Sequence, residues 1–263
     1  MKNLGLEPGM QGKTIVVQGL GNVGSYTSMI AQDEGGARVI GVSEVEGAIY
    51  KPEGIDIHDL LRYRKETGSI LNYPGAQNFQ KNDRSKVLEF ECDILVPAAL
   101  ENQITMENAH KIKARIIAEA ANGPTTAEAE EVLIKSGKMI IPDVYLNAGG
   151  VTVSYFEWLK NLSHMRFGRM EKRFNQKTYE NLVALVERLT GHNIGEKERS
   201  LLVKGADEID LVRSGLEETM ITSYHQIREI MKRKRKVEDL RTAAFVNAIN
   251  KISSDYLALG IFP

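Results

Sequence analysis

A glycine-rich segment near the start of the chain is the sequence feature that most constrains the fold. It reads Gly-Leu-Gly-Asn-Val-Gly over residues 19–24, and it joins a short apolar run, Lys13 to Gln18, to a helical pattern, Tyr26 to Gln32. Three glycines at this spacing permit a tight turn, a close approach to the backbone, and close packing of a helix on a strand. The segment therefore predicts a strand–turn–helix unit within an α/β sheet.

Short apolar runs go on alternating with helix-length polar patterns as far as Pro142, a rhythm typical of a parallel sheet. Helices are expected to cover both faces of the sheet, because three of the runs are almost continuously apolar at their centres. The predicted fold class is therefore α/β, a Rossmann-type doubly wound and mostly parallel sheet. We expect five strands, at Lys13 to Gln18, Arg38 to Ser43, Cys92 to Pro97, Ala114 to Glu119 and Met139 to Pro142.

Beyond Asn147 the pattern becomes helical, and no convincing strand follows. Glycines at 191 and 195 interrupt this region and indicate a helix-and-loop excursion from the sheet domain. We expect helices at Val151 to Leu162, Met170 to Thr190, Ala206 to Lys236 and Asp239 to Leu259.

The glycine segment and a later acidic residue together predict a dinucleotide site. Gly19 permits the turn, Gly21 lets the backbone approach a pyrophosphate, and Gly24 allows helix–strand packing, so the helix N-terminus faces the phosphates. Glu44 follows Gly24 by twenty residues, at the end of the second predicted strand, where it can accept hydrogen bonds from the adenosine ribose. Glu46 competes for this role. The alternative is a glycine turn with an unrelated surface glutamate.

The same residues favour one nicotinamide cofactor over the other. A carboxylate at position 44 repels a 2′-phosphate, and residues 44–47 contain no arginine to accommodate one. We therefore expect NAD in preference to NADP, with Asn22 and Val23 completing the cofactor loop.

Three later sequence blocks are too specific to be explained by the fold alone. They are Ala-Glu-Ala-Ala-Asn-Gly-Pro-Thr-Thr at 118–126, Pro-Asp-Val-Tyr-Leu-Asn-Ala-Gly-Gly-Val at 142–151, and Thr-Val-Ser-Tyr-Phe-Glu-Trp-Leu-Lys-Asn at 152–161. They resemble signature blocks of the glutamate dehydrogenases, and the resemblance extends from Met1 to Ile249. The related leucine, valine and phenylalanine dehydrogenases share the architecture and remain an alternative.

The resemblance implies an activity and a set of site residues. The activity is oxidative deamination of L-glutamate to 2-oxoglutarate and ammonium. Ala98 and Ala99 would lie on the adenosine side of the cofactor, Asn122 and Asn147 beside the nicotinamide, and Ser154 near the side-chain carboxylate of glutamate. An asparagine offers the donor and acceptor that a carboxamide needs, and a serine at a helix start can donate to an anion. Alternatively, the asparagines only complete turns beside neighbouring glycines.

The helical region resembles the antenna of animal and some protist glutamate dehydrogenases. This implies a sheet domain at 1–164, an antenna at 165–212, and a pivot helix and final helix at 213–263, in a subunit of a homohexamer. It also implies the mitochondrial matrix for a eukaryotic protein, and the cytoplasm otherwise. Residues 25–33 contain no arginine, although the family uses arginines there for GTP. Tyr224 to Glu229 likewise departs from the family's ADP-binding pattern, so both regulators are doubtful.

The resemblance places the catalytic Lys and Asp of the family in an N-terminal domain that precedes the region matched here. We therefore expect no catalytic residue in this chain, and no turnover without that domain. The hypotheses are the cofactor-binding part of the enzyme, or a non-catalytic NAD-binding or assembly module.

Composition excludes several other classes of function. Lys plus Arg number 34 against 35 Asp plus Glu, which provides no field for nonspecific nucleic-acid binding. The five histidines are scattered without metal-ligand spacing, and Ser154 lacks a hydrolase elbow. The single cysteine, Cys92, cannot form an internal disulfide, and no stretch approaches the roughly 20 apolar residues of a membrane helix. We expect a protein that is soluble inside a cell.

Overall fold

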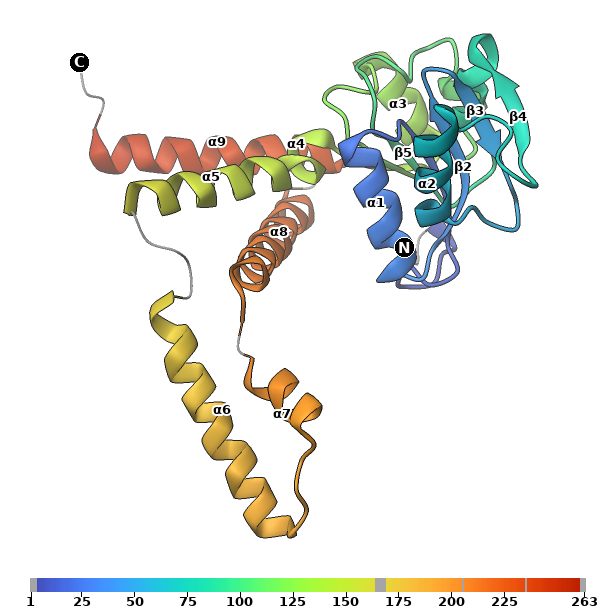
Figure 1. The fold of residues 1–263 in the computed structure, drawn as a ribbon. Coiled ribbons are helices and arrows are strands. Elements are labelled where there is room, and N and C mark those ends of the chain that lie inside the picture. Colours follow the sequence, from blue (N-terminus) through green and yellow to red (C-terminus); the bar gives the residue numbers. More distant parts are fainter. Residues whose placement is uncertain (1–3, 164–168, 205, 235, 261–263) are drawn as a thin grey trace. The chain divides into compact units, whose positions relative to one another are not determined.

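A computed structural model describes residues 4–163, 169–204, 206–234 and 236–260. The chain divides into two compact units, one made of Met1–Ala148 and Gln226–Pro263, the other of Gly149–His225 (Figure 1). The first unit contains the sheet, and the second is helical. The expected domain boundary at 164/165 lies outside the described residues.

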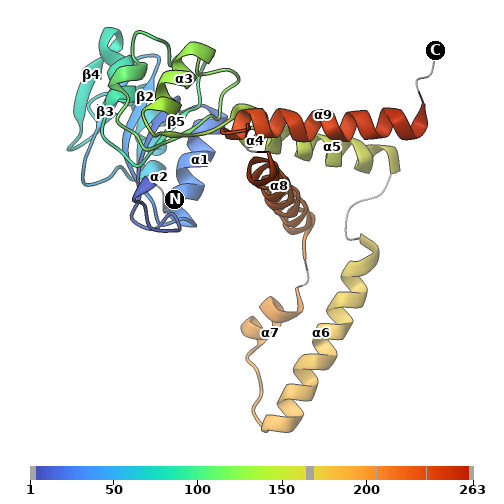
Figure 2. The same ribbon diagram turned by 180° about the vertical axis from the view of Figure 1, so that it is seen from behind.

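Among the residues that the structure describes, the sheet of the first unit has seven strands in the order β4-β3-β2-β1-β5-β6-β7. Its β4 edge, with β3 and β2 beside it, can be followed in Figure 2. Five adjacent strands, β2, β1, β5, β6 and β7, pair in parallel, which confirms the mostly parallel α/β sheet. In contrast, β3 is antiparallel to both β2 and β4. The strands are β1 (Thr14–Gln18), β2 (Arg38–Glu44), β3 (Gly47–Tyr50), β4 (Gln77–Gln80), β5 (Ile94–Pro97), β6 (Ile116–Ala118) and β7 (Met139–Ile141).

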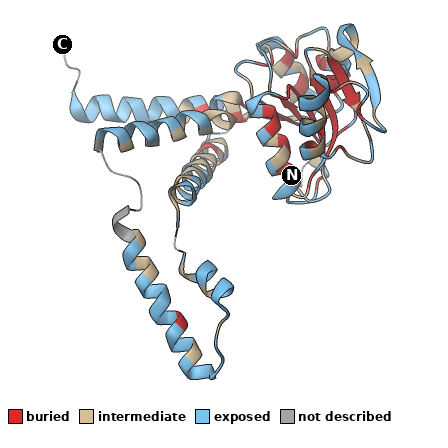
Figure 3. Cartoon of the chain, in the orientation of Figure 1, coloured by how far each residue is buried: buried red, intermediate tan, exposed pale blue. Residues whose placement is uncertain are grey.

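Helices cover both faces of this sheet, and each face has its own hydrophobic core (Figure 3). Ile15 and Val17 of β1 pack in the core that includes α1 (Asn22–Asp33) and α2 (Ile57–Thr67). Val16, which points the other way, packs with α3 (Ala127–Lys135) and the 3-10 segments η2 (Lys81–Glu89) and η3 (Ala109–Lys111). The alternation of side chains along a strand thus separates the two cores.

Sequence patterning missed the two antiparallel strands. β3 forms a hairpin with β2, in which Glu44 pairs with Gly47 across the turn Val45-Glu46. β4 is a mostly exposed edge strand with the sequence Gln-Asn-Phe-Gln. Both strands have only four residues; β3 is apolar but too short to give a signal, and β4 is mostly polar. Each strand depends on hydrogen bonds to a neighbouring strand.

The single cysteine lies just before β5 rather than within it, and Cys92 is a buried free thiol. Its burial, and next the neighbouring Asp93 carboxylate, raise the pKa of the thiol from its ordinary 9.0 to about 12. Burial and a raised pKa are typical of a structural cysteine rather than a reactive one.

The four helices expected beyond Asn147 are present with shifted bounds, and one further helix occurs there among the described residues. The expected helix at Val151 to Leu162 begins earlier, and the helix after Gly195 was not separately expected. In the second unit, Glu187 of α6 pairs with Arg199 of α7 at 3.1 Å, and Lys160 of α5 pairs with Glu208 of α8. The bounds are α4 (Asp143–Leu146), α5 (Ala148–Ser163), α6 (Arg169–Thr190), α7 (Glu196–Val203), α8 (Glu208–Arg233) and α9 (Leu240–Leu259).

Candidate dinucleotide site

The glycine loop connects β1 to α1 in a conformation that glycine alone adopts without strain. Gly19 has φ +93°, and a Cβ there would lie 3.0 Å from the carbonyl oxygen of Ala98. A Cβ on Gly24 would lie 1.8 Å from the carbonyl oxygen of Gly19. Gly21 is the N-cap residue of α1, without a side-chain cap, and a Cβ there would meet nothing within 4 Å. The loop thus leaves the helix N-terminus open to an anion.

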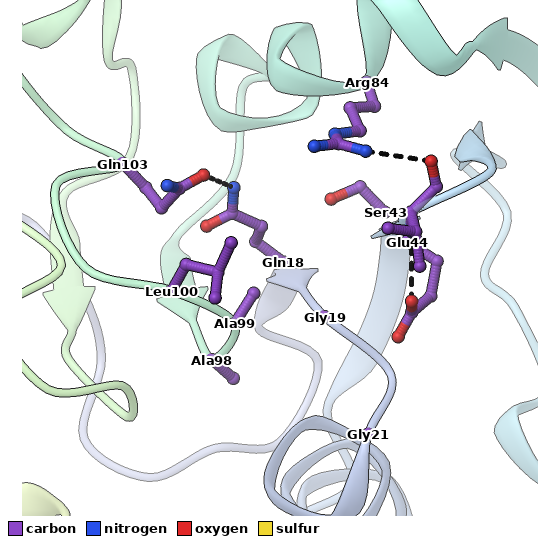
Figure 4. A pocket seen from close by; sticks show the side chains of 11 residues that line it. Gln18, Gly19, Gly21, Ser43, Glu44, Arg84, Ala98, Ala99, Leu100 and Gln103 are labelled. Carbon is purple, nitrogen blue, oxygen red and sulfur yellow. Dashed lines mark hydrogen bonds between the residues drawn. The ribbon is translucent and has the colours of Figure 1, made fainter.

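A pocket of about 300 Å³ opens beside this loop (Figure 4). It lies at the carboxyl ends of β1, β2 and β5, where the chain turns to opposite sides of the sheet and where doubly wound folds bind their ligands. Its lining comprises Gln18, Gly19, Gly21, Ser43, Glu44, Val45, Arg84, Ala98, Ala99, Leu100 and Gln103.

Glu44 lines the pocket with a carboxylate that is only 12% exposed. One oxygen accepts a hydrogen bond from the backbone N–H of Leu20 at 2.6 Å, and the other from Val45 at 3.0 Å. The competing Glu46 does not line the pocket, because its carboxylate accepts from the N–H of Ile70 at 3.2 Å. The acid at the end of β2 is thereby fixed under the glycine loop.

Arg64 of α2 joins the two glutamates to the loop. Its guanidinium lies 3.2 Å from Glu44 and 3.4 Å from Glu46. It also donates to the carbonyl oxygen of Leu20 at 3.2 Å. No sequence signal identifies Arg64, since nothing in the helical pattern of α2 shows that its side chain reaches the glycine loop.

Two more polar lining residues were missed. Arg84 of η2 donates from Nη1 to the carbonyl oxygen of Val45 at 2.9 Å. Gln103 accepts from the buried Gln18 at 2.7 Å. Arg84 comes from a 3-10 segment and Gln103 from a loop, and in neither does sequence periodicity indicate the side-chain direction.

Asn122 and Asn147, predicted from the family blocks, lie together outside the lining of this pocket. Asn147 Nδ2 donates to Asn122 Oδ1 at 2.5 Å. Gly123, which follows Asn122, has φ +51° and donates its N–H to the Asp143 carboxylate at 2.8 Å. The two predicted asparagines are thus one hydrogen-bonded pair on adjacent loops at the β6–β7 side of the sheet.

A cluster of three carboxylates and one arginine supports these loops. Arg241 of α9 lies 2.5 Å from Glu119, which is fully buried, and 2.6 Å from both Glu130 and Asp143. Burial opposes the charge of Arg241, but attraction to Glu119 and the other carboxylates outweighs burial and raises its pKa. Burial also opposes the charge of Asp143 and by itself would raise its pKa. Hydrogen bonds from Gly123 and Arg241 outweigh this effect, so the pKa of Asp143 is lowered. The Gly123 loop is therefore tied to the final helix through charged groups.

A sequence profile for the Glutamate/Leucine/Phenylalanine/Valine dehydrogenase family matches residues 1–214. The chain belongs to this family. The match includes the glycine loop and the three blocks at 118–161, so the resemblance found in the sequence is confirmed.

Individual family members show how much of such a protein this chain represents. It is 48% identical over 260 residues to a mitochondrial glutamate dehydrogenase of Dictyostelium discoideum, covering 99% of this chain and 51% of that protein. It is 36% identical to a glutamate dehydrogenase of Thermotoga maritima, covering 100% and 52%. The hetero-hexameric glutamate dehydrogenase of Thermus thermophilus, in a Leu-bound crystal form, superposes with TM-score 0.74 at 25% identity, covering 100% and 50%. The chain spans about half the length of these relatives.

Ser154, the family residue predicted for the substrate, lies on α5 in the second unit and is exposed. The helix was expected to begin at Val151, but it begins at Ala148, so Ser154 lies in its second turn. The expectation that Ser154 lies at a helix start is therefore wrong, and the helix dipole, which acts mainly within the first turn, does not favour an anion there.

Two classes of site are not found in the part of the chain that the structure describes. No group of three or more His, Cys, Asp or Glu residues there is arranged to hold a metal ion. Among the same residues, no helix combines the length and apolar character needed to cross a bilayer.

Proposed function

We propose that this chain is the cofactor-binding half of an NAD-dependent glutamate dehydrogenase, which interconverts L-glutamate with 2-oxoglutarate and ammonium. The observation that carries the proposal is the pocket at the carboxyl ends of β1, β2 and β5, formed by the glycine loop and Glu44. Membership of the dehydrogenase family supports it independently.

Three features of the pocket support a dinucleotide: the open glycine loop, the acid at the end of β2 and the small side chains after β5. The open face at Gly21 admits a pyrophosphate to the N-terminus of α1, with Asn22, Val23 and Gly24 in its first turn. Glu44 would accept a hydrogen bond from the adenosine ribose, and the small side chains of Ala98 and Ala99 line the pocket next to the loop. The carboxylate at the end of β2 favours NAD over NADP.

The nicotinamide end is assigned to the asparagine pair, and the substrate carboxylate to Ser154. Asn122 and Asn147 retain amide groups that can donate to and accept from a carboxamide. The bound nicotinamide supplies the hydride acceptor of the reaction. We assign no catalytic residue to this chain, whose role is to bind and orient the cofactor.

The helical excursion favours a role in assembly. Phe174, Leu189 and Leu201 expose 73–75% of their surface on α6 and α7. Apolar side chains exposed to this degree on two helices are typical of an interaction surface. We therefore infer that residues 165–212 form the family antenna in a homohexamer, located in mitochondria if the source is eukaryotic and in the cytoplasm otherwise.

Two measurements test the proposed function. Titration of the chain with NADH should give saturable enhancement of the cofactor fluorescence, and absence of binding would contradict the cofactor assignment. Full-length protein assayed with glutamate, leucine, valine and phenylalanine should prefer glutamate. A preference for a branched-chain or aromatic amino acid would contradict the substrate assignment and Ser154 with it.

A further inference from the structure

Arg84 provides a positive charge at the adenosine end of the pocket. It belongs to η2, far along the chain from both the glycine loop and β2, and its side chain reaches over the carboxyl end of β2 (Figure 4). There Nη1 donates to the carbonyl oxygen of Val45 at 2.9 Å. The hydrogen bond fixes the guanidinium at the end of β2, in a pocket that Ser43 and Glu44 also line.

The guanidinium of Arg84 has no carboxylate partner among the residues that the structure describes. Glu44 and Glu46 are paired with Arg64, and the adjacent Asp83 is paired with Lys86 at 2.8 Å. A guanidinium has five N–H donors, of which the Val45 carbonyl occupies one. The remaining donors are free to bind an anionic ligand.

Glu44 repels a phosphate less strongly than its position at the end of β2 suggests. Both oxygens of Glu44 accept backbone hydrogen bonds, and Arg64 lies 3.2 Å from the carboxylate. This arrangement offsets part of the negative charge that a second anion at the ribose would meet. Discrimination at the ribose therefore depends on Arg84 as well as on Glu44.

We propose that Arg84 is a specificity-determining residue that binds the 2′-phosphate of NADP, while NAD leaves the guanidinium on the Val45 carbonyl alone. The proposal rests on the dinucleotide site proposed above, in which the adenosine ribose lies beside Glu44. Arginine forms short, charge-assisted and often bidentate hydrogen bonds to phosphate. The pocket thus accepts NADP as a weaker second cofactor, although Glu44 favours NAD.

The test compares NADH and NADPH binding to the wild-type chain and to Arg84→Gln and Arg84→Lys. We expect Arg84→Gln to weaken NADPH binding by about tenfold, the scale of a lost charged hydrogen bond, and to change NADH binding by less than about twofold. Arg84→Lys should be intermediate, because lysine retains the charge and loses the planar fork. Arg62→Gln is the matched control, since Arg62 is 69% exposed on α2 and does not line the pocket.

Salt dependence gives a second readout that a merely structural role of Arg84 would not change. In the wild type, NADPH affinity should fall more steeply with ionic strength than NADH affinity, and in Arg84→Gln the two slopes should converge. An unchanged ratio of NADPH to NADH affinity in Arg84→Gln overturns the proposal, as does a wild-type chain that binds NADH and no NADPH. A wild-type chain that binds neither contradicts the dinucleotide site itself. Circular dichroism verifies that each variant is folded.

Discussion

At the scale of single residues, the pocket at the carboxyl end of β2 is organised by charge. Glu44 is held by two backbone N–H groups, and Arg64 links it to Glu46 and to the Leu20 carbonyl. A carboxylate with fixed oxygens loses little freedom when a ribose hydroxyl donates to it. Arg84 lies at the same strand end and donates to the Val45 carbonyl oxygen, so it adds a second cation near the end of β2.

Two glycines of the loop should respond differently to the same substitution. Gly24→Ala should destabilise the fold and abolish NADH binding, because its Cβ would lie 1.8 Å from the Gly19 carbonyl oxygen. Gly21→Ala meets nothing within 4 Å and should leave the unfolding free energy within about 0.5 kcal/mol of wild type. It should still weaken NADH binding by about tenfold or more, because the methyl group occupies the path of the pyrophosphate.

Thermal unfolding and NADH titration of both variants check this prediction. A Gly21→Ala variant that binds NADH as tightly as the wild type would show that the phosphates do not approach this face. A fully stable Gly24→Ala variant would show that the loop relaxes at no cost.

At the scale of elements, helices and strands remote in sequence complete the site. The hairpin of β2 and β3 creates the turn whose Val45 carbonyl anchors Arg84. At the β6–β7 side, α9 begins at the N-cap Asp239 and places Arg241 among three carboxylates. One of these, Asp143, accepts from Gly123 beside the asparagine pair. The C-terminal helix thus supports the loop assigned to the nicotinamide.

Removal of the Arg241 charge should destabilise the first unit strongly. Arg241→Met leaves the fully buried Glu119 without its cation, and we expect a loss of about 3–5 kcal/mol, the scale for breaking a buried ion pair on one side. Arg233→Met is the control, because Arg233 is 81% exposed and its pairing should contribute less than about 1 kcal/mol. Denaturant unfolding measures both values. Equal, small losses would mean that the carboxylates rearrange without Arg241.

At the scale of the whole molecule, the chain combines a sheet unit with a helical unit and represents about half of its relatives. The two units differ in how they use apolar residues. The sheet unit has two cores of fully buried side chains, whereas many large apolar side chains of the helical unit are exposed. Under the assembly proposed above, the stability of the helical unit is expected to depend on association between subunits.

Substitutions on the proposed antenna should affect assembly without changing the affinity for the cofactor. In the full-length protein, Phe174→Ser combined with Leu189→Ser should raise the concentration at which the oligomer dissociates by about tenfold or more, because two exposed apolar contacts are lost. Lys177→Ser is the control on the same helix. Sedimentation velocity measures the oligomer, and NADH affinity should not change. An unaltered oligomer would exclude these residues from the subunit interface.

The sequence by itself determined that the sheet is mostly parallel, that the glycine segment joins a strand to a helix, and that Glu44 ends the second strand. These depend on local properties: apolar runs of strand length, glycines where a Cβ would clash, and an acid at a fixed distance along the chain. The family blocks added Asn122 and Asn147, which the structure joins by a hydrogen bond.

Only the tertiary structure decided which charges surround those residues. Arg64, Arg84 and Arg241 reach their partners from segments 18 to 122 residues away, and no periodicity records such contacts. The strands β3 and β4 are likewise stabilised by pairing rather than by their own composition. Local patterns fix backbone conformation, whereas the direction of a long polar side chain depends on how the whole chain packs.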